Sequence, residues 1–390
     1  MKNLLIFMLS LLTVTTYASE KLNSSAYHKL HPETFNSKAV FDAGGGVVAY
    51  LGGSITYNPG WRDMTTDYIK KSFPKADINF IAAGIPSLGS LAHAFRMQTD
   101  IFDKAIPDLM FVEVAVNDRS NGYSDKNQLL AIEGIVRQAL RANPKMDIVF
   151  MAFADPDKLA DYAKGVTPKE IENEKTITDH YSISMIDLSK EVYDRIKNEE
   201  FAWEKDFKDL HPSPFGQQIY FNSIKTALDN LWSSKAEKVS LKMPKPLDKA
   251  CFDNGHYGEI ESANSAPMFT YHKSYKPTDG VGLREGFYDV PMLVSEKPDQ
   301  AFVYKFKGNT IGIAIIAGPD AGMIEYMING KSPKMVNLFT PWSENLHLPW
   351  YIILETGLSS GTNYLSVNII QNKSSKSKGN ACRIVHFLVN

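Results

Sequence analysis

The chain has 390 residues, of which 44% are hydrophobic and 22% are charged, and its formal net charge at pH 7 is -2. This length favours two domains, because a single hydrophobic core rarely grows so large. The balanced charge argues against a nucleic-acid partner and against electrostatic attraction to acidic membranes. The sequence shows neither a Walker-type glycine-rich loop nor the spacing of metal ligands, so we expect no metal and no cofactor.

Residues 1–19 have the pattern of a secretory signal peptide. Lys2 supplies a positive start, an apolar core of eleven residues follows, and Thr16-Tyr17-Ala18 suits the small-residue cleavage rule. The apolar run is too short to span a bilayer comfortably. No cysteine lies at the cleavage site to carry a lipid anchor. We therefore expect a periplasmic or secreted protein without stable membrane insertion.

Residues 20–233 alternate between apolar strands and helices. The expected strands are continuous apolar runs at Val47–Leu51, Ile78–Ala82, Leu109–Val114, Ile148–Phe153 and Ile183–Ile186. The expected helices lie at Trp61–Phe73, Leu88–Phe102, Asn127–Ala142, about Asp155–Tyr181 as an insertion, Ser189–Asn198 and Phe215–Trp232. Continuous apolar strands are typical of parallel sheets that helices cover on both faces. The pattern thus predicts an α/β domain with a mostly parallel sheet.

A linker is expected at residues 234–249, and residues 250–390 change character. Strand-like runs occur at Phe302–Phe306, Thr310–Ile316, Ile324–Ile328, Tyr351–Glu355, Tyr364–Ile370 and Arg383–Val389. Turn residues separate these runs and helical signals are almost absent, which predicts an all-β sandwich or jelly-roll domain. Cys251 and Cys382 lie in this part, and both a disulfide and two free buried thiols remain open.

The stretch Val47–Thr56 ends a strand with Gly52-Gly53-Ser54. Glycines let the backbone bend sharply and let a ligand approach, and ligands of open α/β sheets bind beyond the carboxyl ends of the strands. Ser54 is therefore a candidate nucleophile, although a serine here can also simply cap the next helix.

Three further polar segments complete a candidate site. They are Ala83-Gly84-Ile85-Pro86, Val116-Asn117-Asp118 and Asp209-Leu210-His211-Pro212. The first two follow neighbouring strands, so they should converge with Ser54 at one edge of the sheet.

Together these four segments resemble the blocks of the SGNH (GDSL-type) hydrolase superfamily. The Gly-Gly-Ser-Ile-Thr stretch, the Trp61-Arg62 pair and the late His-Pro-Ser-Pro-Phe-Gly further resemble a secreted bacterial esterase branch with a C-terminal β-sandwich domain. The resemblance implies a three-layer α/β/α, flavodoxin-like catalytic domain. It implies that Ser54 is the nucleophile and His211 the general base. It further implies that the Ser54 N–H, the Gly84 N–H and the Asn117 amide form the oxyanion hole.

The acid that would orient His211 departs from this pattern. The family usually places it three residues before the histidine, where this chain has Lys208. Asp209 is the favoured substitute, with Asp206 in reserve, and a backbone carbonyl is a third way to orient the ring. Trp61, Arg62 and Asp118 are candidates for substrate binding. For each of them a structural role, in core packing or in surface pairing, is the alternative.

The sequence thus predicts a serine esterase that removes O-acyl groups, above all O-acetyl groups, from an oligosaccharide or polysaccharide. Aromatic side chains of the second domain are candidates for stacking on sugar rings, namely Tyr257, Phe287, Tyr288, Trp342 and Trp350. One alternative is a glycoside hydrolase that uses two carboxylates among Asp206, Asp209 and Glu133. The other is a glycan-binding protein without catalysis. No oligomeric state is predicted.

Overall fold

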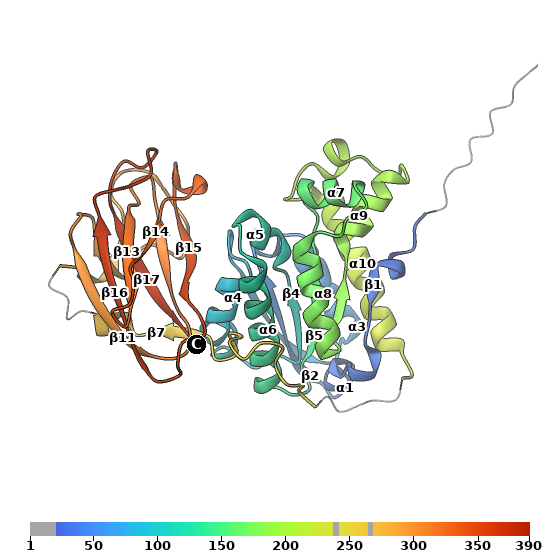
Figure 1. The fold of residues 1–390 in the computed structure, drawn as a ribbon. Helices are drawn as coiled ribbons and strands as arrows, with labels where there is room; N and C mark the ends of the chain where they lie inside the picture. Colours follow the sequence, from blue (N-terminus) through green and yellow to red (C-terminus); the bar gives the residue numbers. More distant parts are fainter. Residues whose placement is uncertain (1–20, 237–241, 264–267) are drawn as a thin grey trace, which may run out of the picture.

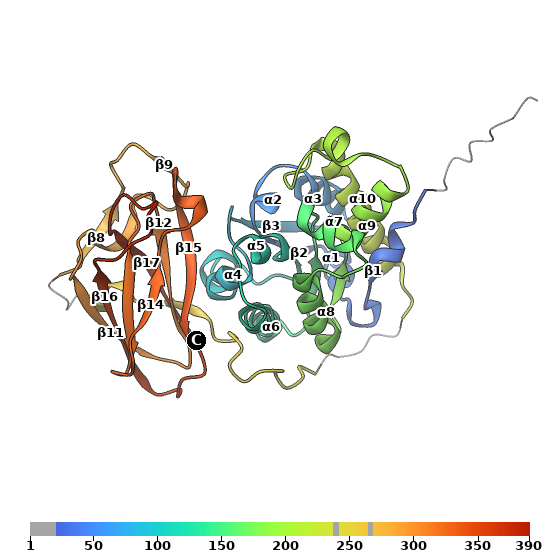
Figure 2. The same cartoon turned by 45° about the horizontal axis from the view of Figure 1, so that its top comes forward.

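The computed structural model describes residues 21–236, 242–263 and 268–390 (Figure 1). The expected signal peptide, residues 1–19, lies outside the described residues. The described chain forms an α/β domain followed by a domain of antiparallel strands, which lie beside each other in both Figure 1 and Figure 2. The predicted fold classes of both domains are confirmed.

The first domain is built on a six-stranded sheet in the order β1-β6-β5-β4-β2-β3. Its strands are β1 (His28–Lys29), β2 (Gly45–Gly52), β3 (Asp77–Gly84), β4 (Leu109–Val112), β5 (Asp147–Met151) and β6 (Ser184–Ile186). All neighbours pair in parallel except β1, which adds an antiparallel edge that the sequence did not predict. The parallel strands have the flavodoxin-like order, in which the chain reverses direction beside the first of them.

Helices cover both faces of this sheet. They are α1 (Ser37–Asp42), α2 (Ser54–Tyr57), α3 (Trp61–Ser72), α4 (Ser90–Met97), α5 (Ala115–Ser120), α6 (Asp125–Ala142), α7 (Pro156–Ala163), α8 (Lys169–Tyr181), α9 (Leu188–Lys197) and α10 (Pro214–Ser233). The predicted helix at 88–102 ends as a π-helical segment at Gln98–Phe102, and the predicted insertion divides into α7 and α8.

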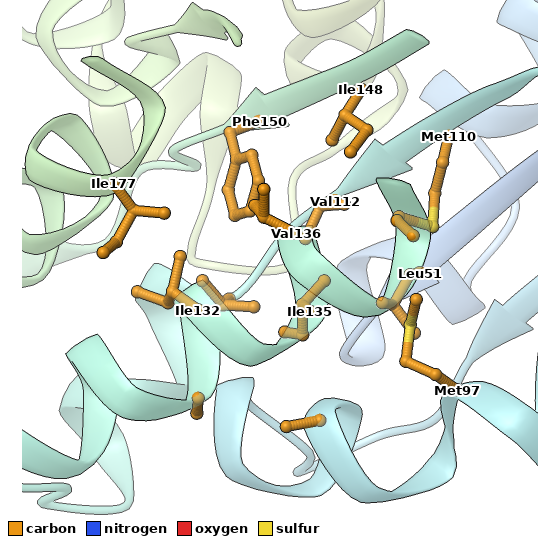
Figure 3. Close-up of a cluster of buried hydrophobic side chains, with 14 of the residues drawn as sticks. Leu51, Met97, Met110, Val112, Ile132, Ile135, Val136, Ile148, Phe150 and Ile177 are labelled. Carbon is orange, nitrogen blue, oxygen red and sulfur yellow. The ribbon is translucent and has the colours of Figure 1, made fainter. Parts of the chain in front are cut away.

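Alternating strand residues form two separate cores. Leu51, Val112 and Phe150 pack on one face against Ile132 and Ile135 of α6 and their neighbours (Figure 3). The strand residues that alternate with these, such as Tyr50, Phe111 and Val149, point to the opposite face of the sheet. There they pack against α3, α9 and α10. Since both faces are buried, the strands read as continuous apolar runs, and this is why the sequence identified them.

The second domain is a sandwich of two sheets. One sheet has the order β8-β10-β17-β12-β15-β9, with β7 paired to β17, and the other has the order β11-β16-β13-β14. The strands are β7 (His256–Gly258), β8 (Thr270–Tyr275), β9 (Gly282–Leu283), β10 (Val290–Ser295), β11 (Ala301–Lys307), β12 (Ile311–Ala317), β13 (Met323–Ile328), β14 (Lys334–Asn337), β15 (Leu346–Glu355), β16 (Thr362–Ile370) and β17 (Cys382–Val389). One apolar core fills the space between the sheets.

The two domains touch along α4 and α6, and α4 faces the sandwich in both views (Figures 1 and 2). The ring of Phe252 packs against that of Phe95 in α4, with 5.1 Å between the ring centroids. Gln138 of α6 donates hydrogen bonds of 2.7 Å to the carbonyl oxygens of Ala94 and Phe252. The residues just after the expected linker therefore pack on the α/β domain. Cys251 and Cys382 are both buried, free thiols.

Candidate active site

The Ser54 hydroxyl lies at the carboxyl end of β2, where the chain turns into α2. Its Oγ is 2.8 Å from Nε2 of His211, a distance at which the two atoms share a hydrogen bond. His211 lies in the loop between the π-helical segment Trp203–Phe207 and α10. Residues 157 positions apart are thus brought together at the edge of the sheet, which is the arrangement of a nucleophile beside its base.

The turn that carries Ser54 leaves no space for larger residues. A Cβ atom on Gly53 would lie 2.0 Å from Oδ1 of Asn117, and one on Gly84 would lie 2.5 Å from the backbone nitrogen of Tyr57. The Gly53 N–H donates a 2.9 Å hydrogen bond to the buried carboxyl group of Glu113. Both glycines therefore permit close packing around the serine. The hydrogen bond to Glu113 holds the turn against the core.

Asn117 and Gly84 border different hollows. Asn117, in the first turn of α5, lines a cavity of about 800 Å³ together with Ser54 and His211. Gly84, at the end of β3, lines an adjoining cavity of about 710 Å³. Asn117 and Gly84 both lie next to the turn that carries Ser54, because Asn117 contacts Gly53 and Gly84 contacts the backbone of α2. Their role as oxyanion donors stays a prediction.

The carboxylates near His211 have different partners. Oδ1 of Asp209 accepts the backbone N–H of His211 at 2.6 Å and lies 3.9 Å from the ring Nδ1. The carboxylate of Asp206 accepts the backbone N–H of Ala202. Asp209 is thus the predicted acid that lies beside the imidazole, although the ring N–H does not reach it in a hydrogen bond.

The structure corrects two of the three predicted substrate-binding residues. Trp61 is fully buried and packs against the rings of Tyr50, Phe111 and Phe153, so it is unavailable to a sugar. Asp118 is also fully buried, where it accepts the backbone N–H of Ser90 at 2.7 Å. In both cases the helix carries the side chain into the core, which a pattern of residue types does not reveal.

Arg62 holds the backbone next to the serine. Its guanidinium donates to the carbonyl oxygens of Thr56 and Tyr57 at 3.0 and 3.2 Å and pairs with Asp63. These bonds fix the end of α2. Its binding of substrate stays a prediction.

Glu133, one of the carboxylates that a glycoside hydrolase would use, is a structural acid. It is buried and accepts hydrogen bonds from the hydroxyl of Tyr181 and from the backbone N–H groups of Leu247 and Asp248. A carboxylate bound by three protein donors and closed off from solvent does not meet a sugar.

Several of the buried carboxyl groups of the α/β domain, Glu113, Asp118 and Glu174 among them, have a raised pKa. Burial raises the pKa of Glu113 to about 7 and the pKa of Asp118 to about 7. Burial and the charges of Asp118 and Glu113 raise the pKa of Glu174 well above its usual value. These groups therefore hold protons at pH values where exposed carboxyls are ionised.

The second domain completes the walls of the site. Trp342 and Arg284 both line the cavity that holds Ser54 and His211. Trp342 is 56% exposed, so its ring is free to receive a ligand. Tyr257 and Phe287 line the adjoining cavity instead. Trp350, by contrast, packs against the core of the sandwich.

Within the described ranges, no three His, Cys, Asp or Glu side chains are grouped so that they would hold a metal ion. In the same ranges, no helix has the length and apolar character needed to cross a membrane.

Comparison with known proteins gives matches to the fold and to the first domain. The chain resembles the crystal structure of a two-domain esterase (CEX) active on acetylated mannans, solved alone and with mannopentaose. In both cases the TM-score is 0.71 and the identity 18%, over 90% of this chain and 93% of the other. Axe2, an acetylxylan esterase from Geobacillus stearothermophilus, matches 49% of this chain and 98% of its own at 15% identity and a TM-score of 0.38. No curated protein sequence matches the chain.

The first domain is identified by its sequence profile. Residues 50–219, which carry Ser54, Gly84, Asn117 and His211, match the profile of the GDSL-like Lipase/Acylhydrolase family. This chain therefore contains a GDSL-like lipase/acylhydrolase domain at residues 50–219, and the resemblance noted in its four sequence blocks is confirmed.

Proposed function

We propose that the protein is a serine esterase that removes O-acetyl groups from a carbohydrate. The observation that carries this proposal is the 2.8 Å contact between Ser54 Oγ and His211 Nε2 in an open cavity of about 800 Å³. A hydroxyl becomes a competent nucleophile when an imidazole can take its proton. The match of residues 50–219 to a lipase and acylhydrolase family supports the same chemistry.

In the proposed reaction, His211 takes the proton of Ser54 as the Ser54 oxygen attacks the acyl carbonyl carbon. The Ser54 N–H, the Gly84 N–H and the Asn117 amide stabilise the oxyanion that forms. When the intermediate collapses, His211 returns the proton to the sugar oxygen, and the deacylated sugar leaves. Water, activated by His211, then attacks the acyl-enzyme and releases acetate and free Ser54.

A carbohydrate substrate is supported by the second domain. Trp342 presents an exposed ring at the cavity that contains Ser54, and aromatic faces are common platforms for sugar rings. The matched two-domain structure, described as active on acetylated mannans, has the same domain arrangement over 90% of this chain. At 18% identity this likeness concerns the fold, so the particular sugar is not inferred from it.

We further propose that residues 1–19 direct the protein to the periplasm or the medium and are then removed. The charged start, apolar core and small residues before position 19 support export. Sequencing the N-terminus of the mature protein checks this proposal, which fails if Met1 or Lys2 is retained.

Replacement of Ser54 tests the esterase. Ser54→Ala should abolish acetate release from 4-nitrophenyl acetate and from acetylated xylan and mannan, because loss of a triad nucleophile lowers kcat by on the order of a millionfold. Ser332→Ala, at an exposed position of the sandwich, is the matched control and should retain full activity. Circular dichroism shows whether both variants are folded.

Two results would contradict the assignment of Ser54. One is turnover above about 1% of wild type in Ser54→Ala, far more than loss of a nucleophile leaves. The other is wild-type protein that binds glycans but neither turns over esters nor reacts with a fluorophosphonate at Ser54. That outcome would instead support a non-catalytic glycan-binding protein.

A further inference from the structure

Arg284 lies in the wall that the two cavities share. It lines the cavity of about 800 Å³ that contains Ser54 and His211, and also the adjoining cavity of about 710 Å³ between the domains. It reaches this position from the second domain, 230 residues after Ser54 in the sequence. Of the described residues that line the first cavity, only Arg284 and Arg119 are arginines.

The backbone holds Arg284 firmly in place. It directly follows β9, which pairs in parallel with the start of β15. Its N–H donates to the carbonyl oxygen of His347 at 2.9 Å, and its own carbonyl oxygen accepts the N–H of Phe287 at 3.2 Å. The side chain therefore extends toward the cleft from a backbone position that these hydrogen bonds fix.

The guanidinium of Arg284 forms no ion pair with a carboxylate of the described residues. Its one hydrogen bond there is a long one, 3.4 Å from Nη2 to the hydroxyl of Ser87, and its buried Nε has no hydrogen-bond partner among them. Partial burial without a carboxylate also lowers the pKa of this guanidinium. A cation held partly out of water with donors unused is unfavourable until an anion reaches it.

Several of the other charged side chains around the cleft already have partners, whereas Asp157, which also lines the first cavity, forms no ion pair with the described residues. Arg119 pairs with Asp161 at 2.6 Å and with Glu170 at 3.5 Å. Glu285, the sequence neighbour of Arg284, accepts the hydroxyl of Tyr57 at 3.1 Å. Asp100, in the adjoining cavity, pairs with Arg96 at 2.6 Å, and Asp155 pairs with Lys158. The guanidinium of Arg284, which lines both cavities and has only the long hydrogen bond to Ser87, thus keeps donors for a ligand there.

We infer that Arg284 binds an anionic group, a uronic acid carboxylate or a sulfate ester, on the glycan that enters the cleft. The planar guanidinium presents paired N–H donors that match the two oxygens of either group. This inference rests on the proposed function for the idea that the cleft receives a glycan. It adds that the sugar bound next to Ser54 and His211 carries a negative charge or adjoins a unit that does.

Binding of defined oligosaccharides tests the inference. Isothermal titration calorimetry on the full chain with Ser54→Ala compares trigalacturonic acid, a κ-carrageenan tetrasaccharide and mannotetraose. At least one anionic probe should bind about 10-fold or more tightly than the neutral one, and added salt should weaken only the anionic binding. The carboxylate and sulfate probes distinguish the two sources of charge.

Variants at position 284 connect the preference to this side chain. Arg284→Met should remove the preference for the anionic probe, whereas Arg284→Lys should keep part of it because the charge is retained. Arg284→Gln gives a second neutral variant in case the methionine disturbs folding. Lys305→Met is the matched control, since it removes one positive charge from an exposed strand position that lines neither cavity.

Equal binding of all three probes by the Ser54→Ala protein would overturn the inference, and so would a preference that survives in Arg284→Met. Because binding is measured without turnover, this failure is distinct from failure of the esterase proposal. If the protein were an esterase specific for neutral glycans, the inference about Arg284 would fail and the esterase proposal would stand.

Discussion

Asp209 does not form the hydrogen bond to the ring of His211 that the acid of a complete catalytic triad forms. One of its oxygens accepts the His211 backbone N–H at 2.6 Å and lies 3.9 Å from the ring Nδ1. At that distance the carboxylate still favours the positive charge that develops on His211, but it does not fix the tautomer by a hydrogen bond. We therefore expect Asp209 to act first by shaping the loop and second by its charge.

The two aspartates can be separated by substitution. Asp209→Asn should lower kcat for acetate release by about 10-fold or more, because the charge that stabilises the imidazolium is lost. Asp206→Asn should change kcat far less, since its carboxylate serves the backbone of Ala202. Steady-state kinetics on 4-nitrophenyl acetate measures both. The reverse order of effects would make Asp206 the orienting acid.

At the scale of elements, the junction of β2 with α2 is where backbone and side chains are packed most closely around the site. The side chain of Asn117 occupies the space that a Cβ atom on Gly53 would need. The N–H of Gly53 donates a hydrogen bond to the carboxyl group of Glu113. We expect a side chain at position 53 to displace the Asn117 amide. We expect α2 and Ser54 to keep their positions, because their hydrogen bonds do not involve that amide. We therefore expect the position of Asn117, one of the predicted oxyanion donors, to depend on this glycine.

Gly53→Ala should lower kcat by about 10²–10³-fold with a smaller change in KM, as expected when an oxyanion donor is lost. Gly361→Ala is the matched control, because a Cβ there meets nothing within 4 Å and its φ is not positive. Kinetics and thermal melts of both variants separate loss of catalysis from loss of fold. Full activity in folded Gly53→Ala would remove Asn117 from the oxyanion hole.

The sequence predicted the elements whose residues are buried on both sides. β2, β4 and β5 are such strands, and the long apolar stripe of α6 is equally clear. It did not predict β8, whose six residues are all exposed or half-buried, nor the two-residue strand β9. These segments owe their strand conformation to pairing with distant partners, which a local pattern does not contain.

The same distinction applies to the site. Ser54 and His211 could be named in advance because each lies in a short block of characteristic residues, and the structure brings them together. Arg284 had no such block, because its role depends on how the second domain lies against the first. Trp61 and Asp118 were named for their position beside the blocks, yet their side chains face the core.

At the scale of the whole molecule, the buried carboxyl groups make stability depend on pH. Glu113, normally near 4.5, has its pKa raised to about 7 by burial, and Asp118, normally near 3.8, is raised to about 7 as well. Below their unfolded values both states are protonated, and the stability conferred by these groups is fully present. As pH rises through about 7, the folded protein must ionise them in a buried site, and that stability is lost.

The free energy of unfolding should therefore decrease between about pH 5 and about pH 8. In Glu113→Gln, which imitates the protonated side chain, that decrease should be smaller by up to about 3 kcal/mol, at about 1.4 kcal/mol per pKa unit. Urea unfolding at both pH values measures it. Glu344→Gln, at an exposed position, should leave the decrease unchanged. An equal pH dependence in Glu113→Gln and wild type would mean that Glu113 is ionised throughout.

The placement of β17 affects how the molecule is made. This strand lies between β10 and β12, both of which precede it in the sequence by many residues. During synthesis from the N-terminus, β10 and β12 are made before β17. Until β17 pairs with them, each has one edge of unpaired N–H and C=O groups, and such an edge can pair with a strand of another molecule. These strand edges are covered only once residues 382–389 have been made and have paired, so the sandwich is most prone to aggregation in the interval before β17 is available.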